Sequence, residues 1–177
     1  MPVIYHEESR NFHLFNEKNQ LYFYDFKKTD SLDSYILGSG SETGRVLIIF
    51  WKFCDRPMSV CTFEDDSTFS MEHIRQEYPA YGSGDMRYPA QEILQKNGSR
   101  VTEFVYKSHR LYSGKPRLEG LPATYVEEEK EAVTLEVTLE DSLIQTELIL
   151  TYTIYEEFPA IARNARFSSQ RGGEYSS

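Results

Sequence analysis

Hydrophobic positions follow a period of two along the C-terminal half of this chain, a pattern typical of half-buried β-strands. Between residues 132 and 155 the pattern is nearly continuous, with Thr and Glu between the apolar positions. Those apolar positions are Val133, Leu135, Val137, Leu139, Leu148, Leu150, Tyr152 and Ile154. Asp141-Ser142 breaks the alternation once, so the segment predicts an antiparallel hairpin.

A second hairpin is predicted upstream by Asn97-Gly98, the strongest short turn signal of the chain. Its arms are residues 92–95 and 101–106, and the later arm is expected to continue as strand to about Tyr112. The connection to the next hairpin, residues 121–131, predicts a short extended piece and then a solvated acidic stretch, because a run of Glu is most often a hydrated surface.

The remaining C-terminal pattern completes an all-β prediction. Residues 161–167 alternate as a last strand, and residues 168–177 are polar and rich in Gly and Ser, which predicts a disordered tail. Only residues 70–76 resemble a helical turn, and this segment is too short to found a helical layer. Strands without intervening helices predict one large antiparallel β-sandwich over residues 1–167.

Composition supports a single sheet-rich domain and disfavours two classes of partner. The 177 residues are 40% hydrophobic and 14% aromatic, which is ample for a packed core. Lys and Arg number 19 against 28 Asp and Glu, and the net charge of −9 disfavours nucleic acid. The longest apolar run, residues 46–51, is too short to span a membrane and predicts a buried strand. Because the start of the chain lacks the pattern of a secretory signal, we expect a cytoplasmic protein.

The sequence contains no clear motif for phosphate binding, metal binding or catalysis. The Gly-rich residues 38–44 precede an apolar strand and no Lys follows them, so a flexible loop is favoured over a phosphate site. The 4 histidines share no ligand spacing, and Cys54 and Cys61 match neither a redox pair nor a zinc pattern, so no metal or cofactor is expected. Asp65, Asp66 and Asp85 could supply a carboxylate pair for sugar hydrolysis, but the residues around Asp65-Asp66 favour an acidic turn.

One loop has a composition that predicts a fixed shape and a contact surface. Residues 76–90 read Gln-Glu-Tyr-Pro-Ala-Tyr-Gly-Ser-Gly-Asp-Met-Arg-Tyr-Pro-Ala. Its glycines permit backbone angles closed to other residues, and its prolines fix φ. The tyrosines, with Asp85 and Arg87, have the makeup of a sugar-facing surface. The alternative is a buried loop in which Asp85 and Arg87 pair with each other or with backbone groups.

Four stretches of the chain resemble the N-terminal β-domain of bacterial-type glycoside hydrolase family 36 α-galactosidases. They are residues 63–90, which contain this loop, 97–106, 114–126, which begin Gly-Lys-Pro-Arg-Leu, and 158–167, which begin Phe-Pro-Ala-Ile-Ala-Arg-Asn. Taken in order, they cover most of residues 57–167. The resemblance implies a large, galactose-mutarotase-like β-supersandwich that precedes a β/α barrel, and the barrel carries both catalytic aspartates.

The resemblance also implies how such a domain is used. Whole enzymes of this family hydrolyse terminal α-galactosides such as melibiose and raffinose, so this chain, which ends before the barrel, is expected to hold no catalytic residue. Family members are commonly tetramers in which the N-terminal domain approaches a neighbour's active site. The matching loop makes Tyr81, Asp85 and Arg87 candidates for an interface or substrate-proximal role. Residues 38–53 and those after Phe167 depart from the family's pattern, which suggests a truncated or frame-disturbed chain.

Three hypotheses follow for the function. The leading one is a non-catalytic N-terminal domain of an α-galactosidase-like glycoside hydrolase that serves oligomer assembly and forms part of the wall of the sugar site. The second is a free-standing carbohydrate-binding module with the tyrosine loop as its platform, and the third is a small hydrolase in its own right. Since a domain without its barrel exposes apolar surface, we expect self-association.

Overall fold

The structure is a computed structural model. It describes residues 3–8, 10–16, 20–26, 31–38, 62–63, 66–70, 76–82, 88–118, 120 and 123–169. Within these ranges, no helix has the length and apolar character needed to cross a membrane.

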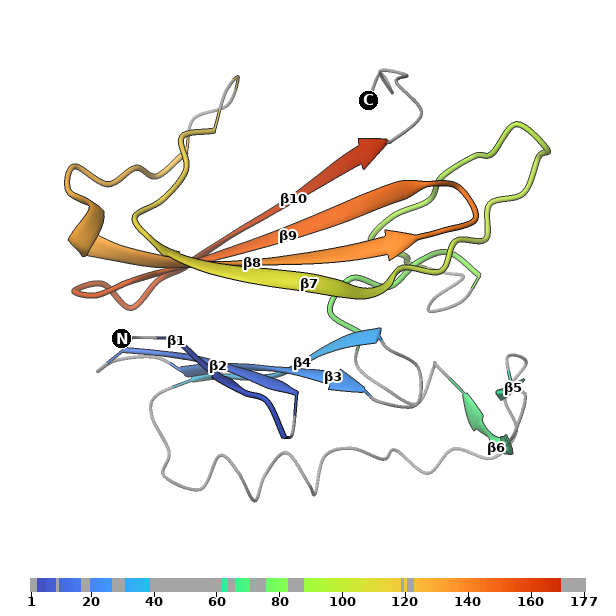
Figure 1. The fold of residues 1–177 in the computed structure, drawn as a ribbon, viewed down its shortest axis with the longest axis horizontal. Coiled ribbons are helices and arrows are strands. Elements are labelled where there is room, and N and C mark those ends of the chain that lie inside the picture. Colours follow the sequence, from blue (N-terminus) through green and yellow to red (C-terminus); the bar gives the residue numbers. More distant parts are fainter. Residues whose placement is uncertain are drawn as a thin grey trace.

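The described residues form two four-stranded antiparallel sheets that lie face to face (Figure 1). The first consists of β1 (Val3–His6), β2 (Asn11–Phe15), β3 (Gln20–Phe26) and β4 (Ser31–Gly38), in chain order. The second consists of β7 (Val105–Ser113), β8 (Ala132–Asp141), β9 (Thr146–Tyr155) and β10 (Ile161–Ser169), also in chain order. A short pair, β5 (Thr62–Phe63) and β6 (Asp66–Ser70), and the 3-10 helix η2 (Glu129–Glu131) complete the described elements. The predicted antiparallel all-β sandwich is confirmed.

The core lies between the two sheets and is built from the alternating residues of the predicted hairpin. In the β8–β9 register Leu135 lies opposite Tyr152, and both side chains are buried. Val3, Phe12 and Leu14 of the first sheet close the core from the other side. Burial of each such side chain stabilises the fold by about 1.5–3 kcal/mol, so the alternation itself determines which face of each sheet turns inward.

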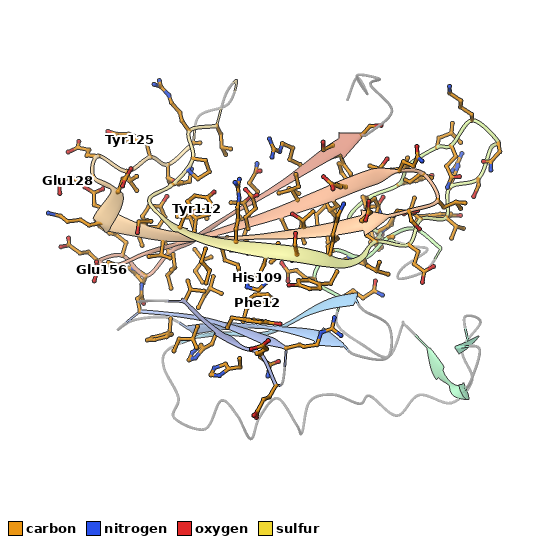
Figure 2. All side chains as sticks on the ribbon, viewed as in Figure 1. Phe12, His109, Tyr112, Tyr125, Glu128 and Glu156 are labelled. Atoms are coloured by element: carbon orange, nitrogen blue, oxygen red, sulfur yellow. The ribbon has the colours of Figure 1, made fainter. Side chains whose placement is uncertain are left out.

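A histidine sits where the two sheets meet. The ring centroid of His109 on β7 lies 4.4 Å from that of Tyr5 and 4.7 Å from that of Phe12, both from the first sheet. Figure 2 shows Phe12 and His109 between the sheets. The His109 Nδ1 atom is 2.7 Å from the hydroxyl of Tyr106, and burial lowers the pKa of the imidazole below its ordinary value.

The predicted hairpin over residues 132–155 is confirmed, and Asp141 explains its turn. Its buried carboxylate accepts hydrogen bonds from the backbone N–H groups of Leu143 and Ile144, at 2.9 and 3.2 Å. A carboxylate that satisfies turn amides in this way fixes where the strand ends. The last strand is also confirmed, although β10 continues to Ser169.

The second predicted hairpin is only half right. The turn at Asn97-Gly98 forms, with Gly98 at φ 85°, and the predicted strand to about Tyr112 is present as β7 from Val105 onward. Residues 92–95 and 101–104 are not strands, so those parts of the two arms were predicted wrongly. The first arm is instead held by individual hydrogen bonds in place of the regular ladder of a hairpin. One of them, 2.7 Å long, runs from Gln95 Nε2 to the carbonyl of Val101.

Some predictions concern residues that the structure does not describe. They are the strand at 46–51, most of the helical turn at 70–76 and most of the predicted tail, from residue 170 onward.

Candidate functional site

The loop at residues 76–90 is closed at its base by backbone hydrogen bonds. The N–H of Tyr81 donates to the carbonyl of Gln91 at 3.1 Å, and the N–H of Ala90 donates to that of Pro79 at 2.8 Å. Ala80 and Gln91 form an isolated parallel bridge between the same two segments. The two ends of the loop are therefore joined to each other.

Glu77 fastens the first end of this loop to the second sheet. The side chain is buried, and its carboxylate accepts hydrogen bonds from the phenol of Tyr152, at 3.0 Å, and from the guanidinium of Arg163. The Arg163 guanidinium also lies over the Tyr152 ring, 5.8 Å from its centroid. Burial, together with the negative charge of Glu77, raises the pKa of Tyr152 well above its ordinary value, so the phenol remains a donor.

Gln91 fastens the other end. Its Nε2 atom donates a 2.9 Å hydrogen bond to the hydroxyl of Thr102, and both residues are buried. Between the two ends, Gly82 adopts φ 83°, a conformation that L side chains rarely adopt. A Cβ atom at Gly82 would lie 2.9 Å from Cγ2 of Val101, so the chain also passes too close to Val101 for any larger residue.

The three tyrosines of the loop differ in their exposure to solvent. Tyr78 is half-buried against the core, and Tyr88 is 89% exposed. Tyr81 is half-buried at the closed base of the loop. Asp85 and Arg87, the other two predicted site residues, lie outside the described residues.

A second candidate site, which the sequence pattern did not predict, lies at one end of the sandwich. It is a pocket of about 610 Å³, between the segment that leads into β8 and the connection from β9 to β10. Its lining residues are Thr124, Tyr125, Glu128, Lys130, Glu131, Tyr155, Glu156, Glu157, Phe158 and Ala160. Figure 2 labels Tyr125, Glu128 and Glu156 at this end of the molecule. The volume is within the usual range for ligand pockets.

One side of this pocket is held in shape by Glu131. Its carboxylate accepts hydrogen bonds from the backbone N–H groups of Glu127 and Glu128, at 3.1 and 3.3 Å, which organises the turn of η2. Its carbonyl accepts a 3.0 Å bond from the N–H of Glu156 across the pocket. The carboxylate of Glu131 is thus committed to the scaffold of the pocket.

The other side is held by Asn16, which directly follows β2 of the first sheet. Asn16 Nδ2 donates to the carbonyl oxygens of Tyr155 and Phe158, at 2.7 and 2.9 Å. The phenol of Tyr155 donates to the hydroxyl of Thr124 at 2.5 Å. Both walls of the pocket are therefore tied to the sandwich by specific hydrogen bonds.

The chemistry of the pocket is acidic and aromatic. Of its charged side chains, Glu128 pairs with Lys130 at 2.6 Å on the exposed rim. Among the described residues, no group of three His, Cys, Asp or Glu side chains could hold a metal ion. The run of Glu at 127–129 was predicted to be a hydrated surface, and only the fold reveals that part of it lines a pocket with aromatic rings.

Comparisons with known proteins agree with the resemblance seen in the sequence. The family model for the glycosyl hydrolase family 36 N-terminal domain matches residues 46–176. This match runs through residues 46–53 and 168–176, which we had expected to depart from the family pattern. The chain is 44% identical over 174 residues to the α-galactosidase AgaA of Geobacillus stearothermophilus, covering 98% of this chain and 24% of AgaA.

Solved structures give the same result for the fold. The crystal structure of the family 36 α-galactosidase AgaB from G. stearothermophilus superposes with a TM-score of 0.84 at 42% identity, covering 97% of this chain and 23% of AgaB. A variant of AgaA in complex with raffinose superposes with a TM-score of 0.82 at 44% identity, covering 90% of this chain and 22% of that one. The chain thus spans about a quarter of the length of these relatives.

Proposed function

Because the chain belongs to glycosyl hydrolase family 36, as a member of its N-terminal domain family, we propose that it serves as the N-terminal β-sandwich domain of an α-galactosidase. In this proposal residues 1–167 form the sandwich, and the catalytic groups belong to a further part of the enzyme. The domain contributes to oligomer assembly and to the wall of the site that binds α-galactosides of the melibiose and raffinose type. The cytoplasmic location expected from the sequence stays a prediction.

The closed base of the loop at residues 76–90 is the observation that carries this proposal. Glu77 and Gln91 fasten its two ends to buried partners, so the described base of the loop forms a rigid platform. Residues that position a substrate must be held within a fraction of an ångström to be effective, and loops on a rigid scaffold meet this need. Tyr81, Asp85 and Arg87 are the residues of this loop that we propose as substrate-proximal or interface residues.

A domain exchange tests this role. The segment of G. stearothermophilus AgaA that matches this chain is replaced by residues 1–177, and turnover of raffinose is measured. We expect an active chimera in which Asp85→Ala or Arg87→Ala raises KM about tenfold or more and changes kcat less, because these groups hold substrate without taking part in bond cleavage. Lys96→Ala, an exposed change in the neighbouring turn, serves as the matched control.

The outcomes of this experiment separate the parts of the proposal. An active chimera whose KM does not respond to Asp85→Ala or Arg87→Ala would remove the loop from the sugar site. A chimera that folds but lacks activity would argue against use of this chain as an α-galactosidase domain.

The free-standing carbohydrate-binding module remains the second candidate, because Tyr88 presents a ring that is 89% exposed at the edge of the loop. Exposed aromatic faces are the surfaces on which apolar faces of ligands pack. Calorimetric titration of the 177-residue chain with melibiose tests it. Binding that is lost in Tyr88→Ala or Asp85→Ala would favour the module, and no binding alongside an active chimera would favour the enzyme domain.

A further inference from the structure

The pocket between η2 and the β9–β10 connection contains exposed aromatic rings and a carboxylate that has no partner within the described part of the chain. Tyr125 and Phe158 are 75% and 63% exposed, although both line the pocket. Glu131 is occupied by backbone amides and Glu128 by Lys130. Within the described ranges, no interaction involves the carboxylate of Glu156, whose N–H alone is bonded. Exposed rings beside such a carboxylate mark a surface suited to a partner.

The partner that would fit this pocket carries a positive charge next to an apolar group. The pocket lining carries four carboxylates, Glu128, Glu131, Glu156 and Glu157, and one ammonium, Lys130. The carboxylates do not converge to form a metal site. A guanidinium suits this arrangement because the N–H donors along its edge bond carboxylates while its flat face stacks on aromatic rings.

A segment with this chemistry lies at the same end of the molecule. Lys115 Nζ donates a 2.5 Å hydrogen bond to the carbonyl of Thr124, a pocket residue, so the segment that follows starts beside the pocket. Arg117 is exposed and makes no hydrogen bond, ion pair or ring contact within the described part of the structure. Leu118, next to it, is 36% exposed. Pocket and segment are therefore near neighbours on one surface.

We propose that the pocket of one copy receives Arg117 and Leu118 of a second copy of this chain, and that the second copy's pocket receives the same two residues of the first. A two-fold contact places a surface against itself, so the pocket and the residues that fill it must both belong to the same surface. Arg117 then pairs with Glu156 and stacks on Tyr125 or Phe158, while Leu118 covers apolar ring surface. This inference rests on the assembly role in the proposed function and names the surface that serves it.

Sedimentation velocity over a series of concentrations of the 177-residue chain tests the contact. Glu156→Arg and Arg117→Glu each place like charges together, so each is expected to weaken self-association about tenfold or more. The double variant exchanges the two charges and is expected to restore most of the lost affinity. Glu103→Arg is the matched control, because Glu103 is exposed and its backbone binds Asp141 at the far end of β8 from the pocket. Circular dichroism verifies that each variant is folded.

Each outcome bears on the contact. Recovery in the double variant, with the control unchanged, supports it. If the chain stays monomeric at about millimolar concentration, its self-affinity is weaker than any functional contact would need. That result overturns the proposed contact and argues against assembly through this domain. A chain that associates equally well with and without the changes at Glu156 and Arg117 overturns the contact only, since assembly then uses another surface.

Discussion

Tyr152 and Glu77 meet inside the sandwich through a 3.0 Å hydrogen bond, although 75 positions separate them in the sequence. Tyr152 belongs to the core of β9, and Glu77 begins the loop that carries the predicted site residues. A buried carboxylate is tolerated only when its oxygens are bonded, and Arg163 supplies the neutralising charge from the more exposed side. The position of the loop is thereby linked to the packing of the core.

Loss of Tyr152's hydroxyl and loss of Glu77's carboxylate are both expected to destabilise the fold, but by different amounts. Tyr152→Phe leaves the Glu77–Arg163 ion pair in place and is expected to lower the free energy of unfolding by about 1–2 kcal/mol. Glu77→Ala leaves a buried hydroxyl and a guanidinium without their acceptor, and a loss of about 3 kcal/mol is expected. Urea unfolding followed by circular dichroism measures both.

The control for this prediction is Glu92→Ala. Glu92 pairs with Arg100 at 2.8 Å on the surface, and such a pair is expected to contribute less than about 1 kcal/mol. If Glu77→Ala destabilises the chain no more than Glu92→Ala does, the link between loop and core is not supported.

Two glycines offer a matched test of how tightly the loop is packed. Gly82 and Gly98 have nearly the same φ, 83° and 85°, so alanine is strained by about 1 kcal/mol at both. A Cβ atom at Gly98 meets nothing within 4 Å, whereas one at Gly82 lies 2.9 Å from Val101 Cγ2. Gly82→Ala is therefore expected to destabilise the chain by about 1–3 kcal/mol more than Gly98→Ala.

A double variant checks that the clash is the cause of this difference. Val101→Ala removes the methyl groups that Gly82→Ala would meet, and Val101 is 53% exposed, so the change alone is expected to be mild. Thermal unfolding should show that Gly82→Ala is less harmful in the Val101→Ala background. Equal effects in both backgrounds would mean that the clash is relieved in another way.

The sequence predicted those parts of the fold whose signals are local. In β8 and β9 the period of two identified both strands and the apolar positions, such as Leu135 and Tyr152, that form the core between the sheets. The expectation of a half-buried strand was wrong for the opposite face, where polar residues such as Thr134 and Thr153 are also buried. The first sheet was not predicted in this way. In β2 only Phe12 and Leu14 are buried, and their neighbours include His13 and Phe15. So short a pattern is a weak strand signal, and the two residues are buried only because the second sheet packs against them.

The sites depend on contacts between distant segments, and the sequence could not show these. The loop at 76–90 was identified by its composition, but its attachment requires Tyr152 and Arg163, which come from β9 and β10. The pocket joins residues 124–131 to residues 155–160, and each segment taken alone is a polar connection. Chain topology, which brings these segments together, is not encoded in any one of them.

The pH dependence of stability is expected to report on the histidine between the sheets. Because burial lowers the pKa of His109 below its ordinary 6.5, the unfolded chain binds this proton more readily than the folded chain. The stability that depends on neutral His109 is therefore complete above pH 6.5 and is lost as the pH falls below it. The groups that face the ring are Tyr5, Phe12 and Tyr106, and the guanidinium of Arg10 lies over the Tyr106 ring at 5.7 Å. None of these supplies a negative charge to a protonated imidazole.

Comparison with His109→Phe isolates this contribution. For each protein the urea midpoint is measured at pH 8 and at about pH 5.5. Because the carboxylates titrate alike in both proteins, any difference between the two shifts in midpoint reports the imidazole, whose unfolded pKa lies within that range. The unmodified chain is expected to lose more stability over this interval than His109→Phe, which carries no titrating ring at the interface. Equal losses would show that His109 accepts its proton without loosening the contact between the sheets. A larger loss in the variant would mean that the proton strengthens this contact, the reverse of what burial against Tyr5 and Phe12 predicts.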